Sequence, residues 1–405
     1  MEPFKNPFRP GAGQQPPYLA GRKKEQDEFQ LLLDQDPVLK NLIITGLRGV
    51  GKTVLLESLK PLALRKGWFW AGTDLSESAS VSEQTLAIRI LTDLAALVSS
   101  FTIKEIEKNP VGFKSTVEKI EVKLSYATLV DIHMHTPGLE SDKIKHILEV
   151  VWEAIKGKAN GIVFAYDEAQ NLKDKAPDKQ YPLSVLLEVM QHLQRKQIPY
   201  LLILTGLPTL FPNLVEARTY AERMFHNITL DKLSVQESKE AIKKPIHGDK
   251  CPVTFTDETI TTIVELSGGY PYFIQFFCKE LYDSYLQQVS VGIEKPNVSI
   301  NEIIRKLDID FYSGRWSRIT DRQRDLLIIA AKLPNSNSDF SIQDIVAKSN
   351  ELAGENKFKP SHANQILNKL IELGLIFKSR HGEYSFAVPM LADYIKRQEK
   401  TKNGH

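Results

Sequence analysis

A glycine-rich octapeptide, residues 46–53, carries the most specific chemical signature in the chain. It reads Gly-Leu-Arg-Gly-Val-Gly-Lys-Thr and matches the phosphate-binding loop pattern G-x-x-x-x-G-K-[ST] without a substitution. Glycines let backbone N–H groups turn inward and surround anionic phosphates at a helix N-terminus. Lys52 can reach the β- and γ-phosphates, and the Thr53 hydroxyl can ligate Mg²⁺. A glycine-rich turn that arose by chance is the alternative.

The residues on either side of this loop predict the strand and helix that the motif requires. Residues 41–44 form a short apolar run of the length of a buried parallel strand, and residues 54–59 continue as a helix. A strand, a glycine loop and a helix in this order favour nucleotide binding. We therefore predict that ATP contacts the loop through Gly46, Arg48, Gly49, Val50, Gly51, Lys52, Thr53 and Val54.

Two adjacent carboxylates follow a second apolar run, residues 161–166. We predict that Asp167 holds Mg²⁺ through its water shell, together with Thr53. Glu168, one residue further on, would polarise the water that attacks the γ-phosphate. The alternative is a strand that ends in a solvated acidic turn, but the intact phosphate loop upstream favours the catalytic role.

A third apolar run, residues 199–204, ends at Thr205. In P-loop ATPases with an additional central strand, a polar residue at this strand end senses the γ-phosphate and positions water. Thr205 is the candidate for this role. An ordinary strand-to-loop turn is the alternative, and the loose spacing leaves it open.

The composition is that of an ordinary globular protein. Hydrophobic residues make up 42% of the chain and charged residues 25%. Its length of 405 residues is enough for two or three domains. A net charge of +2 argues against an extended surface that wraps a polyanion. Cys251 and Cys278 are neither a disulfide framework nor a metal-binding pair, and no stretch reaches the roughly 18 apolar residues of a membrane span. With no signal-peptide core, we expect a cytoplasmic protein without a membrane partner.

Alternating strand and helix patterns predict an α/β fold with a parallel sheet between layers of helices. This domain spans residues 18–230 and follows a Pro- and Gly-rich arm at residues 1–17. Residues 102–140 fit the alternation poorly, and we treat them as an insertion or hairpin with a β-like stretch at 119–134. Helical patterns alone follow at residues 231–312, which predicts a small helical lid domain.

The C-terminal segment, residues 318–397, has a pattern of its own. Helices are predicted at residues 320–331, 341–349 and 360–373, and a hairpin follows at 375–388. Three helices and a hairpin are typical of a winged helix-turn-helix domain. In DNA-binding versions of this domain the third helix enters the major groove.

The charge of this segment leaves two functions open: binding double-stranded DNA or docking a protein partner. Basic and polar residues lie near the start of the third helix and in the hairpin: Lys357, Lys359, Ser361, His362, Asn364, Gln365, Lys378, Arg380 and His381. Acidic residues dilute this charge: Asp339, Asp344, Glu351, Glu355 and Glu372. Charge alone does not decide between the two functions.

Taken together and in order, the motifs resemble those of prokaryotic ATP-binding proteins of the origin-recognition-like AAA+ class, close to the STAND NTPases and the archaeal ATPase family. The resemblance covers nearly the whole chain. It rests on residues 6–13, 19–22, 46–53, 166–170, 205–208, 220–225, 269–273 and 386–389. It implies a P-loop AAA+ module with an αβα sandwich, a helical lid and a C-terminal winged helix.

The resemblance also implies contacts with the base of the nucleotide. Leu19, Ala20 and Arg22 would border the adenine by their position in the motif Leu-Ala-Gly-Arg. Pro271, in the lid motif, would pack near the same ring.

A catalytic arginine is implied as well. Arg223 matches a position at which relatives place an arginine that acts on nucleotide, often across a subunit interface. Arg218 is the second choice, and a surface ion pair with Glu222 or another acid is the alternative role for Arg223. The expectation that follows is self-association promoted by ATP.

One departure from the family pattern changes the functional prediction. Residues 268–272 read Gly-Gly-Tyr-Pro-Tyr, without the arginine that replication initiators carry there to reach the γ-phosphate. The pattern favours a regulatory switch in which hydrolysis is slow and ATP with Mg²⁺ controls a winged-helix output. The alternatives are a docking scaffold that binds nucleotide without turnover, and an ATP-regulated DNA-binding factor in replication, transposition or defence.

Overall fold

The computed structural model describes residues 5–11, 13–75, 78, 82–109, 116–247, 251–293, 298–334, 339–352, 357–380 and 382–403. The first four residues of the arm, Ala12, the segment 110–115 of the insertion, Glu355 and His381 lie outside the described residues. The chain divides into two compact units. We call residues 23–45 and 55–229 the sheet unit, and residues 1–22, 46–54 and 230–405 the helical unit.

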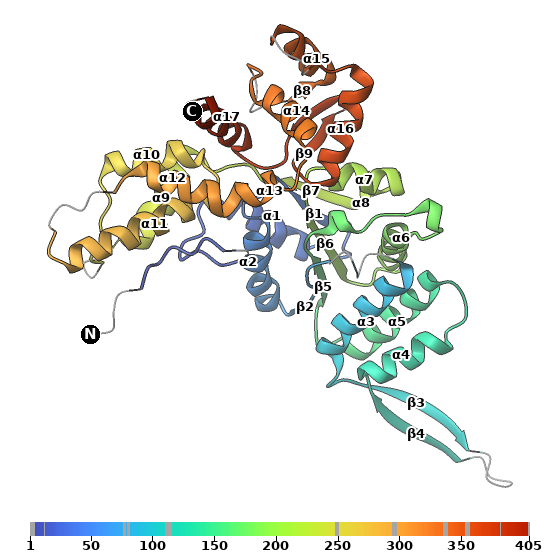
Figure 1. The fold of residues 1–405 in the computed structure, drawn as a ribbon. Helices are drawn as coiled ribbons and strands as arrows, with labels where there is room; N and C mark the ends of the chain where they lie inside the picture. Colours follow the sequence, from blue (N-terminus) through green and yellow to red (C-terminus); the bar gives the residue numbers. More distant parts are fainter. Residues whose placement is uncertain are drawn as a thin grey trace. The chain divides into compact units, whose positions relative to one another are not determined.

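A five-stranded parallel sheet forms the centre of the sheet unit (Figure 1). The strands lie in the order β2 (Trp68–Ala71), β5 (Gly161–Tyr166), β6 (Tyr200–Gly206), β1 (Asn41–Thr45) and β7 (Phe225–Thr229). Neighbouring strands are parallel throughout. Burial of every residue in β1, β5 and β6 explains their continuous apolar runs. The predicted α/β fold class and the additional central strand, β6, are confirmed.

The sequence does not predict β7, the edge strand beside β1. Only Phe225 and Ile228 of its five residues are buried, because one side of an edge strand remains open to water. A strand with two separated apolar residues produces no continuous apolar run. Only its parallel pairing with β1 in the tertiary structure identifies β7 as a strand.

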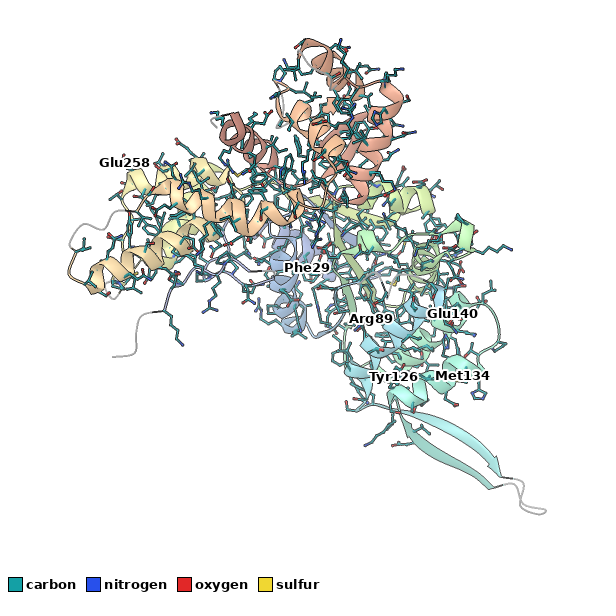
Figure 2. All side chains as sticks on the ribbon, in the orientation of Figure 1. Phe29, Arg89, Tyr126, Met134, Glu140 and Glu258 are labelled. Atoms are coloured by element: carbon teal, nitrogen blue, oxygen red, sulfur yellow. The ribbon has the colours of Figure 1, made fainter. Side chains whose placement is uncertain are left out.

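Helices cover both faces of the sheet: α1 (Lys23–Leu33), α2 (Lys52–Arg65), α3 (Glu83–Val98), α5 (Glu140–Ile155), α6 (Pro182–Arg195), α7 (Leu210–Ala217) and α8 (Ala221–Met224). The apolar sides of α3, α5 and α6 share one core with Phe164 and Tyr200 of the sheet. On the opposite face, Phe29 of α1, which Figure 2 labels, meets Trp70 edge to face, with ring centroids 6.3 Å apart.

The insertion at residues 102–140 contains a hairpin followed by a helix. Strands β3 (Thr102–Asn109) and β4 (Thr116–Lys123) pair antiparallel and extend away from the helices of the sheet unit (Figure 1). The β-like stretch predicted at 119–134 is wrong beyond residue 125, where α4 (Tyr126–His135) begins. Ser125 caps this helix by accepting a hydrogen bond from the Thr128 N–H, 3.2 Å away. Leu129 is fully buried, so packing overrides the β-branched residues of the stretch.

The helical unit contains the predicted lid helices and the elements of the C-terminal segment. The segment predicted as the lid, residues 231–312, holds α9 (Val235–Lys243), α10 (Asp257–Ser267), α11 (Pro271–Ser290) and α12 (Ile300–Leu307). A π-helical turn (Asp308–Ser313) and α13 (Gly314–Trp316) follow. The C-terminal segment holds α14 (Asp321–Ala331), β8 (Phe340–Ser341), α15 (Ile342–Glu351), α16 (Pro360–Glu372), β9 (Ile376–Arg380), β10 (Glu383–Phe386) and α17 (Leu391–Asn403). Its three strands form an antiparallel sheet in the order β8-β10-β9. In the described part of the chain, no helix combines the length and apolarity needed to cross a membrane.

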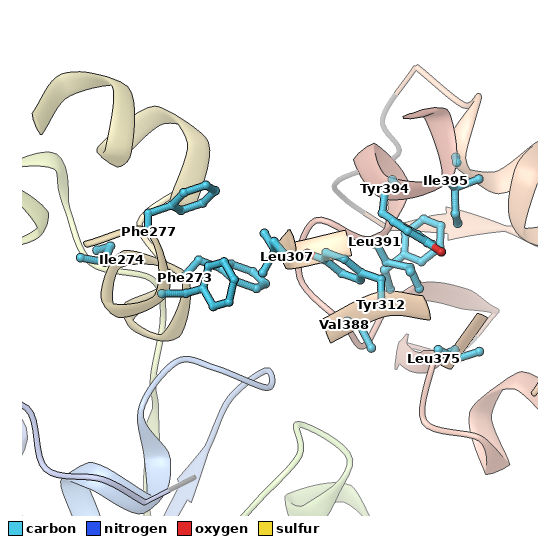
Figure 3. Packing of buried hydrophobic residues seen from close by; sticks show 14 of the residues in the cluster. Phe273, Ile274, Phe277, Leu307, Tyr312, Leu375, Val388, Leu391, Tyr394 and Ile395 are labelled. Atoms are coloured by element: carbon cyan, nitrogen blue, oxygen red, sulfur yellow. The ribbon is translucent and has the colours of Figure 1, made fainter. Parts of the chain in front are cut away.

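Lid and C-terminal segment share one apolar core (Figure 3). Tyr312, at the end of the lid, stacks on Tyr394 of α17 with ring centroids 4.9 Å apart. Its hydroxyl donates to the carbonyl oxygen of Pro389 at 3.0 Å. Phe273 of α11 belongs to the same core. Helix α11 and the C-terminal segment are therefore packed around one set of apolar side chains.

The N-terminal arm also belongs to this core. Phe8 is 2% exposed and stacks on Phe255, with ring centroids 6.2 Å apart. The side-chain amide of Asn6 donates to the Lys279 carbonyl oxygen at 3.0 Å and to the Asp283 carboxylate at 2.7 Å. The arm thus has no regular secondary structure but is held against α11 by packing and hydrogen bonds.

Candidate functional site

The phosphate loop, residues 46–53, has the backbone conformation that its glycines predict. Gly49 and Gly51 adopt φ angles of 81° and 91°, which residues with a side chain rarely reach. A Cβ atom built on Gly51 meets no heavy atom within 4 Å, so the space beside this residue is open. Helix α2 begins at Lys52, directly after the loop. Open space beside backbone N–H groups at a helix N-terminus is what an anionic phosphate requires.

Lys52 is held inside the loop. Its side chain is 8% exposed, and Nζ donates to the carbonyl oxygens of Gly46 and Leu47 at 3.0 and 3.1 Å. A buried ammonium needs such acceptors, and phosphate oxygens would be stronger ones because they are charged. The residues present therefore fit a polyphosphate, with Lys52 already positioned in the loop.

Arg22 supports the loop from the arm side. It is 7% exposed, and its Nη2 donates to the carbonyl oxygens of Val50 and Asp231 at 3.0 and 2.8 Å. These bonds join the predicted adenine-bordering motif to the loop, so Arg22 has a positioning role in this structure. Neighbouring Ala20 is buried and Leu19 is half-buried.

The start of the lid helix α11 contacts the same loop. The backbone N–H of Tyr272 donates to the Gly49 carbonyl oxygen at 3.2 Å. Pro271 is the first residue of α11, where its missing N–H leaves no helical hydrogen bond unmade. The structure therefore brings the predicted loop, arm and lid residues together within the helical unit.

The carboxylate residues lie in the sheet unit, at the carboxyl edge of the sheet. Asp167 follows β5 and is 3% exposed, and Thr205 near the end of β6 is fully buried. The Thr205 hydroxyl donates to Oδ1 of Asp167. Because β5, β6 and β1 are parallel neighbours, their carboxyl ends share one edge, and Gly46 follows β1 directly in the chain.

Glu168 has an unusual backbone and an ordered side chain. Its φ of 52° lies in the left-handed region, which is uncommon for a residue other than glycine. Its N–H donates to Oδ1 of Asp167 at 2.8 Å, and Nε2 of Gln170 donates to its carboxylate. Gln170 also accepts from the N–H of Leu207 at 3.1 Å. The side-chain amide of Gln170 thus orients the exposed Glu168 carboxylate and connects the loops that follow β5 and β6.

Asp74 is a third carboxylate at this edge, which the sequence analysis did not assign. It follows β2 and forms a backbone bridge with Asp167. Burial raises the pKa of Asp74, and the negative charges of Asp167 and Glu168 raise it further. In the sequence, Asp74 is recognisable only as a polar residue shortly after the strand at residues 68–71. The order of strands in the sheet shows that it lies beside Asp167.

These acids do not complete a metal site by themselves. Within the described ranges, no group of three or more His, Cys, Asp or Glu side chains is arranged to hold an ion. Mg²⁺ commonly keeps several waters and takes other ligands from substrate phosphates. A buried carboxylate such as Asp167 is an oxygen ligand of the kind that Mg²⁺ takes from proteins.

Arg223 lies on α8, just before the edge strand β7, and its side chain is exposed. No ion pair joins Arg223 to Glu222 or another acid in the part of the chain that the structure describes. Arg218 is half-buried and its Nη1 donates to the Ala217 carbonyl oxygen at 3.2 Å. Arg223 is therefore the more available of the two guanidinium groups.

Solved structures share this architecture. A Walker-type ATPase of Pyrococcus abyssi aligns with a TM-score of 0.60 at 16% identity, over 93% of this chain and 96% of that chain. The ORC2 protein of Aeropyrum pernix in its ADP form aligns with a TM-score of 0.56 at 12% identity, over 97% of both chains. The fold is that of the P-loop AAA+ ATPases. At these identities the likeness concerns the fold alone.

Sequence comparison adds one match. Residues 310–395 match the family described as Domain of unknown function (DUF8462). No curated protein matches the chain in sequence. The matched segment runs from the π-helical turn to α17, so it covers the C-terminal elements and none of the nucleotide-site candidates.

Replacing Thr205 by valine removes the hydroxyl that donates to Asp167 and preserves the shape of the side chain. The buried carboxylate then lacks a charge-assisted hydrogen bond, and the free energy of unfolding should fall by about 1.5–3 kcal/mol. Denaturant titration of the nucleotide-free protein measures this change. Thr205→Ser keeps the hydroxyl and is the matched control. Equal losses in both variants would assign the effect to packing of the methyl group instead.

Proposed function

We propose that the protein binds ATP with Mg²⁺, hydrolyses it slowly, and uses nucleotide state to control its C-terminal segment. The observation that carries the proposal is the phosphate loop, with left-handed Gly49 and Gly51, open space beside Gly51 and Lys52 held inside. The AAA+ fold supports it. So do the structures of similar fold, which include a Walker-type ATPase and an ORC2 protein solved with ADP.

Each residue of the candidate site has a distinct task in this proposal. Lys52 and the loop N–H groups bind the β- and γ-phosphates and offset the charge that develops on them. Thr53 and Asp167 hold Mg²⁺, which supplies further charge neutralisation when it is bound. Glu168 accepts a proton from the attacking water, and Thr205 holds Asp167 in place.

Slow turnover follows from how Glu168 is held. The amide of Gln170 donates to its carboxylate, so one oxygen is engaged before any water is activated. That oxygen has to give up or share the hydrogen bond before it can accept a proton from water. The left-handed backbone at Glu168 adds conformational strain that the surrounding loop has to maintain.

Two substitutions separate hydrolysis from binding. Glu168→Gln should lower phosphate release by about 10²–10⁴-fold, the usual contribution of a positioned general base, while Mg·ATP binds as before. Lys52→Ala should weaken the binding of both ATP and ADP. Steady-state phosphate release and calorimetric titration measure the two effects, with Glu153→Gln, an exposed acid on α5, as the control.

Two results would contradict this assignment. Unchanged nucleotide affinity in Lys52→Ala would remove the phosphate loop as the binding site. If the unaltered protein releases no phosphate, even with DNA or a partner present, hydrolysis is excluded. The remaining function is then docking that depends on bound nucleotide without its turnover.

We also propose that the C-terminal segment is a winged helix that binds double-stranded DNA. The order α14, β8, α15, α16, β9, β10 matches that of a winged helix, and α16 would be the helix that enters the major groove. The specific observation in favour is exposure at its N-terminal end, where Lys357, Lys359, Ser361, Asn364 and Gln365 are open to solvent. These side chains supply both phosphate-binding charge and groups that hydrogen-bond to base edges.

Salt dependence tests the DNA proposal. Affinity for duplex DNA, followed by fluorescence anisotropy between about 50 and 200 mM salt, should fall steeply because bound phosphates release counterions. Lys357→Ala and Lys359→Ala should each reduce the slope of log K against log salt by about one. Lys332→Ala is the control, since its Nζ pairs with Glu399 at 2.6 Å. No binding at low salt, with and without ATP, would instead make this segment a protein-docking module.

We further propose that ATP promotes self-association and that Arg223 acts on the nucleotide of a neighbouring subunit. Arg223→Ala should bind ATP normally and hydrolyse it about 10³-fold or more slowly, as expected for a lost arginine finger. Mixing it with Lys52→Ala should restore activity, because each variant supplies the residue that the other lacks. Sedimentation with ATP and turnover at several protein concentrations provide the measurement. Turnover that is independent of concentration, by a species that stays monomeric, would exclude a role between subunits.

A further inference from the structure

Arg48 links the phosphate loop to the C-terminal segment inside the helical unit. It is the third residue of the loop, and its Nη1 donates to the carbonyl oxygen of Gly374 at 3.1 Å. Gly374 lies in the turn between α16 and β9, with a left-handed φ of 66°. A Cβ atom there would lie 3.0 Å from Nη2 and 3.1 Å from Nη1 of Arg48. The turn therefore needs glycine both for its backbone and for the close approach of the guanidinium.

A second guanidinium, that of Arg315 on α13, stands beside the same loop. It lies over the ring of Phe311, 4.6 Å from the centroid, and donates to the Phe311 carbonyl oxygen. The Phe311 ring is 5.0 Å from that of Tyr272, whose N–H is bonded to Gly49 of the loop. This chain of contacts runs from the loop through two aromatic rings to Arg315.

The positive charge of Arg48 acts on the Arg315 guanidinium. Burial lowers the pKa of the Arg315 guanidinium, and the positive charge of Arg48 is the next largest cause of the same shift. Among the residues that the structure describes, neither guanidinium forms an ion pair with a carboxylate. Two half-buried like charges without an acid partner are unfavourable, and an anion placed near both would remove the repulsion.

We propose that Arg48 and Arg315 form a second cationic site beside the phosphate loop, which takes the terminal phosphate of a nucleoside triphosphate. The phosphate and the Gly374 carbonyl oxygen compete for Arg48. The inference rests on the proposed function, since it needs a nucleotide in the loop. Guanidinium suits this task because it can give two parallel hydrogen bonds to phosphate oxygens.

In this arrangement, binding of the third phosphate changes a hydrogen bond of the C-terminal segment. A diphosphate leaves Arg48 on Gly374, whereas a triphosphate withdraws it from the turn that begins β9. The turn follows α16, the helix proposed to contact DNA. Release of Arg48 thus changes a hydrogen bond next to the output helix, and no movement of the lid as a whole is needed.

Calorimetric titration with ADP and with a non-hydrolysable ATP analogue tests the site. In Arg48→Ala and in Arg315→Ala, the preference for the triphosphate over ADP should fall about tenfold or more, as one charge-assisted hydrogen bond predicts, while ADP affinity stays unchanged. Arg48→Lys should keep part of the preference because the charge remains. Arg305→Ala is the control, since Arg305 is an exposed arginine on α12 of the same unit.

Amide hydrogen exchange provides a second readout that a purely structural arginine would not produce. The amides of Gly374 and Leu375, bonded to the carbonyl oxygens of Ile371 and Leu370, should exchange faster with the triphosphate analogue than with ADP. In Arg48→Ala both nucleotides should give the same fast exchange.

The outcomes distinguish this inference from the proposed function. If ADP binds and requires Lys52, but Arg48→Ala retains the full triphosphate preference or lowers both affinities equally, the second site is refuted and nucleotide binding stands. If the unaltered protein binds neither nucleotide, both proposals fall.

Discussion

The parallel register of β5, β6 and β1 is the constraint on which the rest of the site depends. Parallel neighbours end at one edge, so Asp167, Thr205 and the residue that begins the phosphate loop are all placed by the same hydrogen-bond ladder. A buried carboxylate at such an edge is unfavourable unless it has donors or a cation. Thr205 provides one donor to Asp167, and burial together with the negative charges of Asp167 and Glu168 raises the pKa of Asp74.

Charge of the opposite sign is gathered in the helical unit. Arg48 and Arg315 are held by carbonyl oxygens, and these contacts do not neutralise their charge as an anion would. Cationic groups held only by carbonyl oxygens in the described part of the helical unit suit a ligand that carries phosphates.

The phosphate loop belongs to the same compact unit as the lid and the C-terminal segment. Tyr272 bonds to the loop and packs on Phe311, and the adjacent Tyr312 stacks on Tyr394 of α17. Close-packed aromatic groups transmit displacement because they cannot absorb it. A change at the loop therefore has a contiguous route to the C-terminal helices, through side chains far apart in the sequence.

The sequence by itself determined every feature that is coded by consecutive residues. These are the phosphate loop, the buried strands before Asp167 and Thr205, and helix starts such as the capping box that Ser234 forms with Glu237. Only the tertiary structure decided the features that depend on residues brought from elsewhere in the chain. Half-exposed β7 is a strand because β1 pairs with it, and the stretch from residue 126 is a helix because Leu129 finds a core. Likewise Asp74 meets Asp167, and Arg48 meets Gly374, 326 residues away in the chain. The energies of strand pairing and side-chain packing depend on which residues are close in space. Local sequence patterns do not show which distant residues will meet.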